Sequence, residues 1–394
     1  MDKIDEILTR GVVNIIPDKD RLKKLLTSRS KLNIYLGIDP TATKIHLGHA
    51  VPLRKLQTFA DFGHKVTFLI GDFTALIGDT SDKDSERPVL TTQQIENNFK
   101  TYKKQAQKIL DFTKIEVKYN SEWLVKLQFA DIVKLCQHFS AGDFVSRELI
   151  RKRLESGKKV GLHELLYPVM QGYDSYYMNT DIQLGGSDQT FNMQAGRVLQ
   201  QDLRNKESYI IANSFLDGTD GRKMSKTWDN AVWLDDLPDN MFGKIMSLHD
   251  ELIIQYFSLG TNVSLDKVKE VENRLKSREN PMILKKELAN EVVRELHGGE
   301  KAIKSQKNFE LMFQKRKPSL VNIPSISMEK LPIESTYSQF LLTAKLVKSR
   351  GEAKRLILQK AVEHNDKLVV GDTVPKFKKQ DIIKVGKKNF IKIV

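Results

Sequence analysis

The sequence predicts an α/β protein built on a parallel sheet, followed by a helical region and a small α+β module. Two apolar runs that end in glycine and aspartate, NIYLGID from Asn33 and KVTFLIGD from Lys65, flank the helical pattern AVPLRKLQTFADFG. Parallel strands need a crossover, usually a helix, so a strand, a helix and a strand in this order indicate a parallel sheet.

The middle of the chain, residues 93–172, is helical in pattern along most of its length, and we expect it to lie between two halves of the sheet. A strand pattern returns with TDIQLGGSDQ from Thr180, followed by the helical TFNMQAGRVLQQDL and the apolar SYIIANSF. After Trp228 the pattern is helical again. These observations predict an α/β domain over 1–228 with a helical insertion at about 90–165, and an α-helical domain over 229–315.

A stretch without steady periodicity precedes the C-terminal module. It contains prolines at 318, 324 and 332, and we predict a linker over 316–337. Residues 338–394 then give one helical pattern, RGEAKRLILQ, and the short stretches KLVVGD, DIIKVG and FIKIV, which predict a small α+β domain.

This C-terminal module carries much of the chain's positive charge. The whole chain has a formal net charge of +14, and residues 338–394 contain 14 Lys or Arg against 5 Asp or Glu, a net charge of +9. Such a basic module favours contact with a polyanion, with nucleic acid ahead of a membrane. On charge alone, a solvated, lysine-rich end of the chain is an equal alternative.

The composition excludes several classes of protein. The one cysteine, Cys136, rules out an internal disulfide and argues against a zinc site. No segment approaches the roughly 20 uninterrupted apolar residues of a membrane span. The N-terminus mixes acids and bases from the second residue, unlike a signal peptide. We therefore expect a cytoplasmic protein with no membrane partner and no zinc.

Two histidines, His46 and His49, follow the first predicted strand within IDPTATKIHLGH. Their spacing of three places both imidazoles on one face of a helix, and Gly48 between them lets a ligand approach the backbone. A helix that begins after a strand favours anions, because it presents unpaired backbone amides and the positive end of its dipole. Phosphate is therefore the expected ligand. An ordinary polar role is favoured for the other histidines, which lack this context: His64, His138, His163, His249, His297 and His364.

A second polar stretch, DGRKMSKTW from Asp220, sets Lys223 and Lys226 three residues apart among glycine, serine and threonine. The pattern is typical of a mobile cationic loop. Lysine ammonium groups can neutralise a polyphosphate, and such a loop can close over it. Taken alone, two lysines in a polar loop are more often a solvated surface, but the histidine pair upstream favours a site.

The two stretches together resemble the signatures of a known enzyme class. HLGH at 46–49 and KMSKT at 223–227 are similar to the HIGH and KMSKS motifs of class I aminoacyl-tRNA synthetases, which implies a Rossmann-like catalytic domain. The resemblance covers nearly the whole chain, ends in an S-four RNA-binding domain, and is closest to the bacterial branch of the tyrosyl-tRNA synthetases. The stretches that carry it are YLGIDPTATKIHLGH from Tyr35, LIGD at 76–79, YPVMQGYD at 167–174 and QLGGSDQ at 183–189.

The resemblance implies a tyrosine-tRNA ligase whose substrates are L-tyrosine, ATP and tRNA(Tyr). Such an enzyme makes tyrosyl-adenylate and pyrophosphate, and then transfers tyrosine to the 3′ end of the tRNA. Mg²⁺ accompanies ATP. The reaction needs no protein nucleophile, so it rests on positioning and on stabilising the charge that develops at phosphorus. The resemblance also implies a homodimer formed through the inserted middle segment, and an anticodon-region role for the helical domain.

The resemblance assigns six residues to tyrosine. Three of them lie at spacings of four and three, which places them on one face of a helix. The assigned contacts are Tyr35 and Asp174 for the phenol, Asp79, Tyr167 and Gln171 for the ammonium, and Gln189 near the carboxylate.

It also assigns a set of residues to ATP, between the end of the first strand and the lysine loop. His46, His49, Lys223 and Lys226 are the expected catalytic residues, which contact the phosphates. The further ATP contacts are Gly37, Asp39 and Thr41 at the strand end, Gly186 and Asp188 at the ribose, and Gly48 and Met224 beside the catalytic groups.

The C-terminal stretch LLTAKLVKSRGEAKRLILQKAVEHND resembles the S-four domain, and the resemblance assigns RNA contacts to Ser349, Arg350, Lys354 and Arg355. The chain departs from the family pattern at three places. It has Lys360-Ala361 where a glycine pair is usual, Asn365-Asp366 where Asn-Gly is usual, and Thr227 for the last serine of KMSKS.

Two other interpretations compete. A tryptophanyl-tRNA synthetase shares the fold and both ATP motifs, but indole has no phenol to pair with Tyr35 and Asp174. The other is an RNA-binding protein that keeps the scaffold without catalysis. The intact histidine and lysine pairs argue against it.

Overall fold

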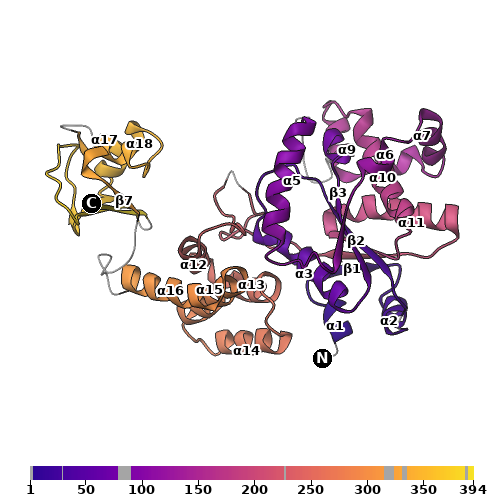
Figure 1. Cartoon of the computed structure of the whole chain (residues 1–394), viewed down its shortest axis with the longest axis horizontal. Helices are drawn as coiled ribbons and strands as arrows, with labels where there is room; N and C mark the ends of the chain where they lie inside the picture. The colour runs from indigo at the N-terminus through magenta and orange to yellow at the C-terminus, as the bar shows by residue number, and fades with distance from the viewer. Residues whose placement is uncertain are drawn as a thin grey trace. The chain divides into compact units, whose positions relative to one another are not determined.

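The computed structural model divides the chain into two compact units, Met1–Ile303 and Lys304–Val394 (Figure 1). Each unit has a sheet of its own. Of the helices in the described part of the chain, none combines the length and the apolar content that crossing a bilayer requires. The structure describes residues 3–28, 30–78, 90–225, 228–314, 324–330, 335–386 and 389–394.

A six-stranded sheet forms the centre of the first unit, in the order β1-β6-β5-β2-β3-β4. All neighbouring strands are parallel except β1, which is antiparallel to β6 at one edge. The α/β class predicted from the sequence is therefore confirmed. The strands are β1 Val12–Ile16, β2 Asn33–Ile38, β3 Lys65–Ile70, β4 Ile115–Tyr119, β5 Ile182–Gly186 and β6 Tyr209–Asn213.

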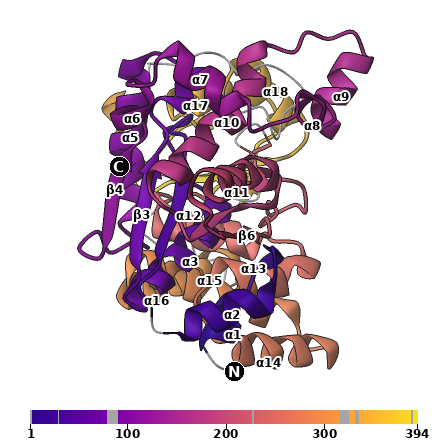
Figure 2. The same cartoon turned by 90° about the vertical axis from the view of Figure 1, so that its right-hand side faces the viewer.

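The strand, helix and strand predicted at the start of the sheet are confirmed. β2 pairs in parallel with β3, and helix α3, Leu47–Asp61, is the crossover between them. α3 packs against β2, β3 and β5, while α11, Thr190–Arg204, packs against β5 and β6. Next to α11 lies α10, Leu162–Tyr177 (Figure 2). These helices bury the apolar strands and leave the carboxyl ends of the strands for a site.

The middle stretch is mostly helical, in agreement with its pattern, but it also contains β4. This strand extends the sheet by pairing in parallel with β3. Its sequence, IEVKY, alternates apolar and polar residues, yet five residues give only a weak signal between two helical patterns. The helices of the stretch before α10 are α5 Thr92–Ala106, α6 Ser121–Leu124, α7 Phe129–Cys136, α8 Ala141–Val145 and α9 Glu148–Glu155.

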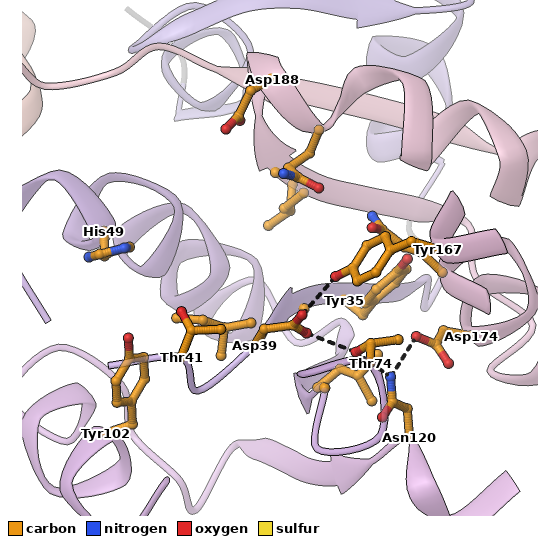
Figure 3. A pocket seen from close by; sticks show the side chains of 18 residues that line it. Tyr35, Asp39, Thr41, His49, Thr74, Tyr102, Asn120, Tyr167, Asp174 and Asp188 are labelled. Carbon is orange, nitrogen blue, oxygen red and sulfur yellow. Dashed lines mark hydrogen bonds between the residues drawn. The ribbon is translucent and has the colours of Figure 1, made fainter. Parts of the chain in front are cut away.

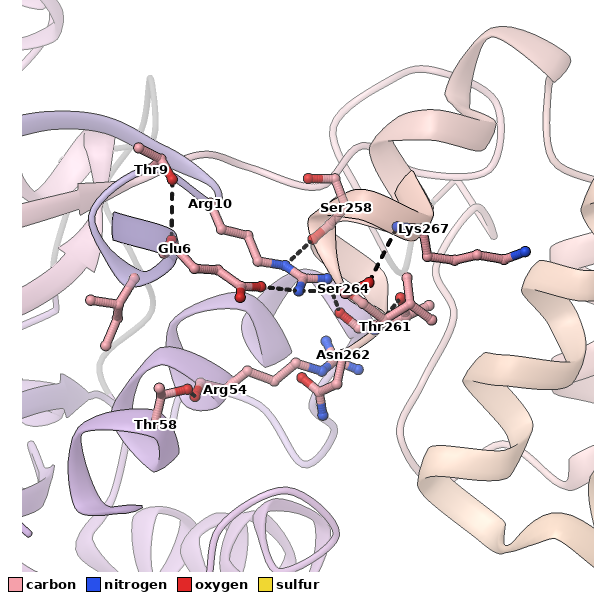
Figure 4. Close-up of polar contacts among 12 residues, drawn as sticks. Glu6, Thr9, Arg10, Arg54, Thr58, Ser258, Thr261, Asn262, Ser264 and Lys267 are labelled. Atoms are coloured by element: carbon pink, nitrogen blue, oxygen red, sulfur yellow. Dashed lines mark hydrogen bonds and ion pairs between the residues drawn. The ribbon is translucent and has the colours of Figure 1, made fainter. Parts of the chain in front are cut away.

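The rest of the first unit is helical, as its pattern predicted. Its helix α13, Ile253–Gly260, is held at its C-terminal end by two arginines from the sheet half of the unit. Arg10 donates to the Thr261 carbonyl at 2.7 Å, and the buried Arg54 donates to the Gly260 carbonyl at 2.8 Å (Figure 4). The last carbonyls of a helix have no partner within it, so these guanidinium groups stabilise the contact between helix and sheet. The other helices are α12 Pro238–Met246, α14 Leu265–Lys276 and α15 Pro281–His297, followed by α16 Gly299–Phe309, which begins in the first unit and ends in the second.

The second unit has a five-stranded sheet in the order β7-β11-β10-β8-β9, with helices α17, Tyr337–Thr343, and α18, Arg350–Leu358, as its helical part. The first two predicted strand stretches contain β9 and β10, and the third, FIKIV, overlaps β11, which begins one residue earlier. Strand β7 lies within the stretch predicted as a linker and pairs in parallel with β11. The strands are β7 Ser325–Ile326, β8 Val362–His364, β9 Lys367–Leu368, β10 Ile382–Val385 and β11 Asn389–Ile393.

Residues other than glycine occupy two turns of this unit where the family pattern has glycine. Lys360 has a φ of 55°, and Asn365 and Asp366, which form the two-residue turn between β8 and β9, have φ values of 48° and 63°. A hairpin turn of this length favours positive φ at both positions, and asparagine and aspartate tolerate it better than most residues. Asn365 is held further by a hydrogen bond to Asp381 at 2.8 Å. The departures from the usual glycines therefore leave the turns in place.

Candidate active site

A cavity of about 240 Å³ lies at the carboxyl ends of β2, β3 and β5 in the first unit (Figure 3). Its walls come from these strand ends, from α10 and from the first turn of α3. In the sheet order, β2 lies between β5 and β3, so the connections from these strands leave in different directions. Ligands of open parallel sheets bind in the crevice that such a divergence creates.

The structure brings most of the residues predicted to bind tyrosine or ATP to this cavity. Asp79 and Lys226 lie outside the described residues. His46, Gly48, Gly186, Lys223 and Met224 are not among the lining residues. The predicted residues that line the cavity are Tyr35, Gly37, Asp39, Thr41, His49, Tyr167, Gln171, Asp174, Asp188 and Gln189.

Asp174 is a buried carboxylate at one end of the cavity, with 2% of its surface exposed. The indole Nε1 of Trp123 donates to its Oδ1 at 2.7 Å, and the amide of Asn120 donates to its Oδ2 at 3.1 Å. Burial raises the pKa of Asp174 to about 8, although both hydrogen bonds act in the opposite direction. Above this pKa the ionised group is an acceptor, and it can accept a hydrogen bond from a donor on a ligand.

Tyr35 extends from β2 beside Asp174, with its hydroxyl donating to Oε1 of Gln183 at 3.1 Å. Burial, and to a lesser extent the charge of Asp174, raises the pKa of Tyr35 well above its usual value. The hydroxyl therefore stays protonated and acts only through hydrogen bonds.

A chain of hydrogen bonds joins this end of the cavity to the end of β2. Asp39 accepts from the Tyr167 hydroxyl at 2.9 Å and from the Thr74 hydroxyl at 2.8 Å, and Thr74 accepts in turn from Asn120 at 3.0 Å (Figure 3). Gly71 makes room for it, since a Cβ there would lie 2.0 Å from Asp39 Oδ1. The network fixes the orientation of Asp39 toward the cavity.

His46 and His49 lie at the start of α3, as the sequence predicted. His46 is the N-cap residue, and its backbone N–H donates to Nδ1 of His49 at 3.3 Å. His49 therefore carries its proton on Nε2. The two rings lie 3.8 Å apart between centroids. Burial, His49 and Lys223 lower the pKa of His46 to about 2, and burial and Lys223 lower the pKa of His49 to about 4. Both imidazoles are neutral at neutral pH and act as hydrogen-bonding groups.

The described part of the lysine loop is held by one asparagine that sequence analysis missed. Asn230 donates to the Lys223 carbonyl at 3.2 Å and to Asp220 at 2.7 Å, and it accepts from the Ser225 backbone N–H at 2.8 Å. Lys223 also forms a β-bridge with Asp217. The base of the loop is therefore ordered by side-chain contacts.

Sequence analysis missed several other residues of the site. Asn120 directly follows β4, so recognising that strand would have placed an amide at the carboxyl edge of the sheet. Trp123 and Gln183 carry no local signal, because they act behind the lining residues. Gly71 is part of the quoted strand pattern, but nothing in the sequence shows which carboxylate it accommodates.

The comparisons with known proteins agree with this geometry. A family model described as class I tRNA synthetases (W and Y) matches residues 27–314. The chain is 39% identical to the tyrosine–tRNA ligase of Oleidesulfovibrio alaskensis, over 100% of this chain and 99% of that protein. It is 40% identical to the tyrosine–tRNA ligase of Carboxydothermus hydrogenoformans, over 99% of this chain and 97% of that protein.

Solved structures show the same fold. A truncated mitochondrial tyrosyl-tRNA synthetase of Aspergillus nidulans matches with a TM-score of 0.66 at 21% identity, over 79% of this chain and 94% of that chain. The tyrosyl-tRNA synthetase of Archaeoglobus fulgidus, solved with L-tyrosine, matches with a TM-score of 0.61 at 20% identity, over 77% and 99%.

The fold, the cavity at the strand ends and the histidine pair at a helix start are consistent with an amino-acid-activating enzyme that uses ATP, and the chain belongs to the class I tRNA synthetases of the tryptophan and tyrosine group. Within that class, full-length identities near 40% place it among the tyrosine–tRNA ligases.

Proposed function

We propose that this member of the tyrosine–tRNA ligases forms tyrosyl-adenylate from L-tyrosine and ATP in the cavity of the first unit, and then transfers tyrosine to the 3′ end of tRNA(Tyr). The observation that carries the proposal is the cavity, which has the buried Asp174 at one end and His49 at the other (Figure 3). A buried carboxylate suits the phenol of tyrosine, and an imidazole at a helix start suits phosphate.

The amino acid lies with its phenol between Tyr35 and Asp174. The ammonium group needs acceptors, and we assign it to the stretch of α10 that carries Tyr167 and Gln171, together with Asp79. Gln189 lies near the carboxylate, where Asn192 holds its Oε1 at 3.0 Å. An analogue without the hydroxyl leaves the buried Asp174 without its ligand partner, which is how a site of this kind discriminates against phenylalanine.

ATP lies over the end of β2 and the first turn of α3. Gly37, Asp39 and Thr41 supply the strand end, while Gly186 and Asp188 are assigned to the ribose. The phosphates face Gly48, Met224 and the catalytic groups. The ATP contacts with catalytic roles are His46, His49, Lys223 and Lys226.

At the phosphates, the two imidazoles provide hydrogen-bonding groups and the two lysines provide positive charge. His49 offers its Nε2–H, because its Nδ1 is occupied by the His46 backbone. His46 has a buried Nδ1 without a hydrogen-bond partner among the described residues. The charge comes from lysine, and Lys223 lies close enough to lower the pKa of both imidazoles. Anionic phosphates complement both kinds of group.

In the first step a carboxylate oxygen of tyrosine attacks the α-phosphorus of ATP, a P–O bond forms, and the bond to pyrophosphate breaks. The protein supplies no covalent partner. It aligns the two substrates and stabilises negative charge on the phosphoryl and leaving-group oxygens, where one well-aimed donor contributes about 3 kcal/mol. Mg²⁺ enters with ATP as part of the substrate. Within the described residues, no group of three His, Cys, Asp or Glu side chains gathers to hold a metal ion.

The second unit is proposed to contact tRNA. Ser349 is the N-cap of α18, and its hydroxyl accepts from the backbone N–H of Glu352 at 3.1 Å. Arg350, Lys354 and Arg355 are exposed on α18, where phosphates can reach them. The net charge of +9 over residues 338–394 supports the same role. Because tRNA is charged where proteins are made, we propose the cytoplasm as the compartment.

We also propose a homodimer that forms through the inserted segment. Val125, Phe129 and Leu162 lie in this segment and are exposed by 62%, 81% and 74%. An exposed apolar surface marks an interface when its side chains form one patch, and we propose that these side chains belong to such a patch. The concentration dependence of the sedimentation coefficient tests this proposal, and Phe129→Lys should shift the chain to monomer.

Exchange of labelled pyrophosphate into ATP tests the proposed activity. We expect exchange that depends on L-tyrosine, with little exchange for L-tryptophan or L-phenylalanine. Equal exchange with tryptophan would refute the assignment to tyrosine. Absence of exchange with all three would refute the enzyme and favour an RNA-binding role.

A further inference from the structure

We infer that Gln183 orients Tyr35 so that Tyr35 and Asp174, at one end of the cavity, both act as hydrogen-bond acceptors. The cavity should therefore also bind an aromatic amino acid whose para group can donate two hydrogen bonds, such as 4-aminophenylalanine. The inference rests on the proposed function, because it concerns the same end of the same cavity. Gln183 is a positioning residue here, since it acts through Tyr35.

The orientation of the Gln183 amide is set by a group that can only accept. Gln183 lies on β5 and is fully buried. Its Nε2 donates to the backbone carbonyl of Met193 at 2.9 Å. A flipped amide would place Oε1 against that carbonyl oxygen, and two acceptors repel each other. The amide nitrogen therefore faces Met193, and Oε1 faces Tyr35.

The space around this amide is tightly filled. A Cβ added at Gly196 of α11 would lie 2.6 Å from Oε1 and 2.9 Å from Nε2 of Gln183. The backbone of α11 therefore lies close against the amide, and the side chain is fixed by packing as well as by its hydrogen bonds.

A fixed Oε1 determines what Tyr35 offers to a ligand. The Tyr35 hydroxyl has one proton, and it donates this proton to Gln183 at 3.1 Å. Its oxygen lone pairs are then the part that can meet a ligand, since Tyr35 lines the cavity and Gln183 does not. Tyr35 is therefore presented as an acceptor.

Asp174 is the second acceptor. Its two oxygens already accept from Trp123 and Asn120, so the protein supplies donors to this carboxylate and no acceptor. When Asp174 is ionised, at a pH above its pKa of about 8, a ligand that reaches it must donate. Tyr35 and Asp174 therefore both favour a ligand group that donates a hydrogen bond.

Para groups differ in how many protons they can donate. A phenol has one O–H, which satisfies one of the two acceptors unless Tyr35 gives up its bond to Gln183. An aromatic amine has two N–H donors of similar size and can satisfy both acceptors. A para fluorine or hydrogen donates none, and it leaves the buried carboxylate without a ligand partner.

The test is pyrophosphate exchange by the full chain, at a pH above the pKa of Asp174, with L-tyrosine, 4-amino-, 4-fluoro- and unsubstituted L-phenylalanine. We expect kcat/KM for the amine within about 10-fold of that for tyrosine, and more than about 10-fold above the other two. An amine no better than the fluoro compound, while tyrosine is used, overturns the inference. Failure with tyrosine itself refutes the proposed function instead.

Variants test the role of Gln183 directly. Gln183→Met releases the Tyr35 proton, so Tyr35 can donate to a phenol, and the ratio of kcat/KM for amine over tyrosine should fall by about 3- to 10-fold. Gln183→Glu is the matched control. Burial against the Met193 carbonyl favours the protonated acid, whose O–H replaces Nε2 as the donor while its other oxygen still accepts from Tyr35, so the ratio should be kept. Tyr35→Phe removes one acceptor and should lower the amine more than tyrosine. An unchanged ratio of kcat/KM in both Gln183→Met and Tyr35→Phe contradicts the inference. If Gln183→Met does not fold, an unchanged ratio in Tyr35→Phe is enough to contradict it.

Discussion

Asp174→Asn is expected to remove a pH dependence from the stability of the first unit. In the folded chain burial raises the pKa of Asp174 from its ordinary value of 3.8 to about 8. Between these two values the folded chain binds one proton more than the unfolded chain. The free energy of unfolding therefore falls as pH rises through this window, and it levels off above it.

The size of the effect follows from the two pKa values. One proton difference changes the free energy of unfolding by about 1.4 kcal/mol per pH unit, so the whole window amounts to on the order of 5 kcal/mol. The amide has no proton to lose and no such slope. It does have an NH₂ group that meets Trp123 or Asn120, both of which donate, and this costs about 1 to 3 kcal/mol at every pH. The slope is therefore a better measure than the difference at a single pH.

The assay is urea unfolding of the parent chain and of Asp174→Asn at a series of pH values between the two pKa values, followed by tryptophan fluorescence. We expect the parent to lose stability relative to the variant by about 1.4 kcal/mol for each pH unit. Parallel curves for the two proteins would refute the reasoning, because they would show that Asp174 titrates alike in the folded and unfolded chain. Asn120→Ala, which removes one donor to the carboxylate, should keep the slope.

Three further outcomes are expected from the geometry of the site. His49→Asn keeps an acceptor for the His46 backbone but loses the Nε2 donor, so kcat for pyrophosphate exchange should fall about 100-fold with little change in KM for tyrosine; an unchanged kcat would show that His49 does not act on the phosphates. Asn230→Ala loosens the base of the lysine loop and should raise KM for ATP about 10-fold through the loss of a hydrogen bond or two; a larger change in KM for tyrosine would contradict this assignment. Deletion of residues 335–394 should spare exchange and lower the rate of tRNA charging, with unchanged charging as the contrary result.

Local patterns in the sequence predicted the features that depend on neighbouring residues. The strands at Asn33 and Lys65 and the helix between them follow from apolar periodicity. The start of α3 at the histidine pair follows from a strand that leads into HLGH. The spacing of Tyr167, Gln171 and Asp174 predicted one helical face, and all three line the cavity.

Features that depend on distant contacts were not accessible in this way. Tyr167 and Asp39 are 128 residues apart in the sequence and meet only because α10 crosses the end of β2. Gln183 lies on a neighbouring strand, 148 residues from Tyr35 in the sequence, and fixes the direction in which the Tyr35 hydroxyl donates. Strand β4 was missed because five alternating residues are outweighed by the helical patterns on both sides, and Asn120 was missed with it.

The most direct test of the account is a crystal structure of the full chain with a non-hydrolysable analogue of tyrosyl-adenylate. The account predicts the phenol oxygen within hydrogen-bond distance, about 2.6 to 3.2 Å, of Asp174, with Tyr35 on the other side of the phenol. It also predicts that the phosphate mimic lies beside His49. A phenol ring at the His49 end of the cavity, or an analogue bound elsewhere on the chain, would contradict it.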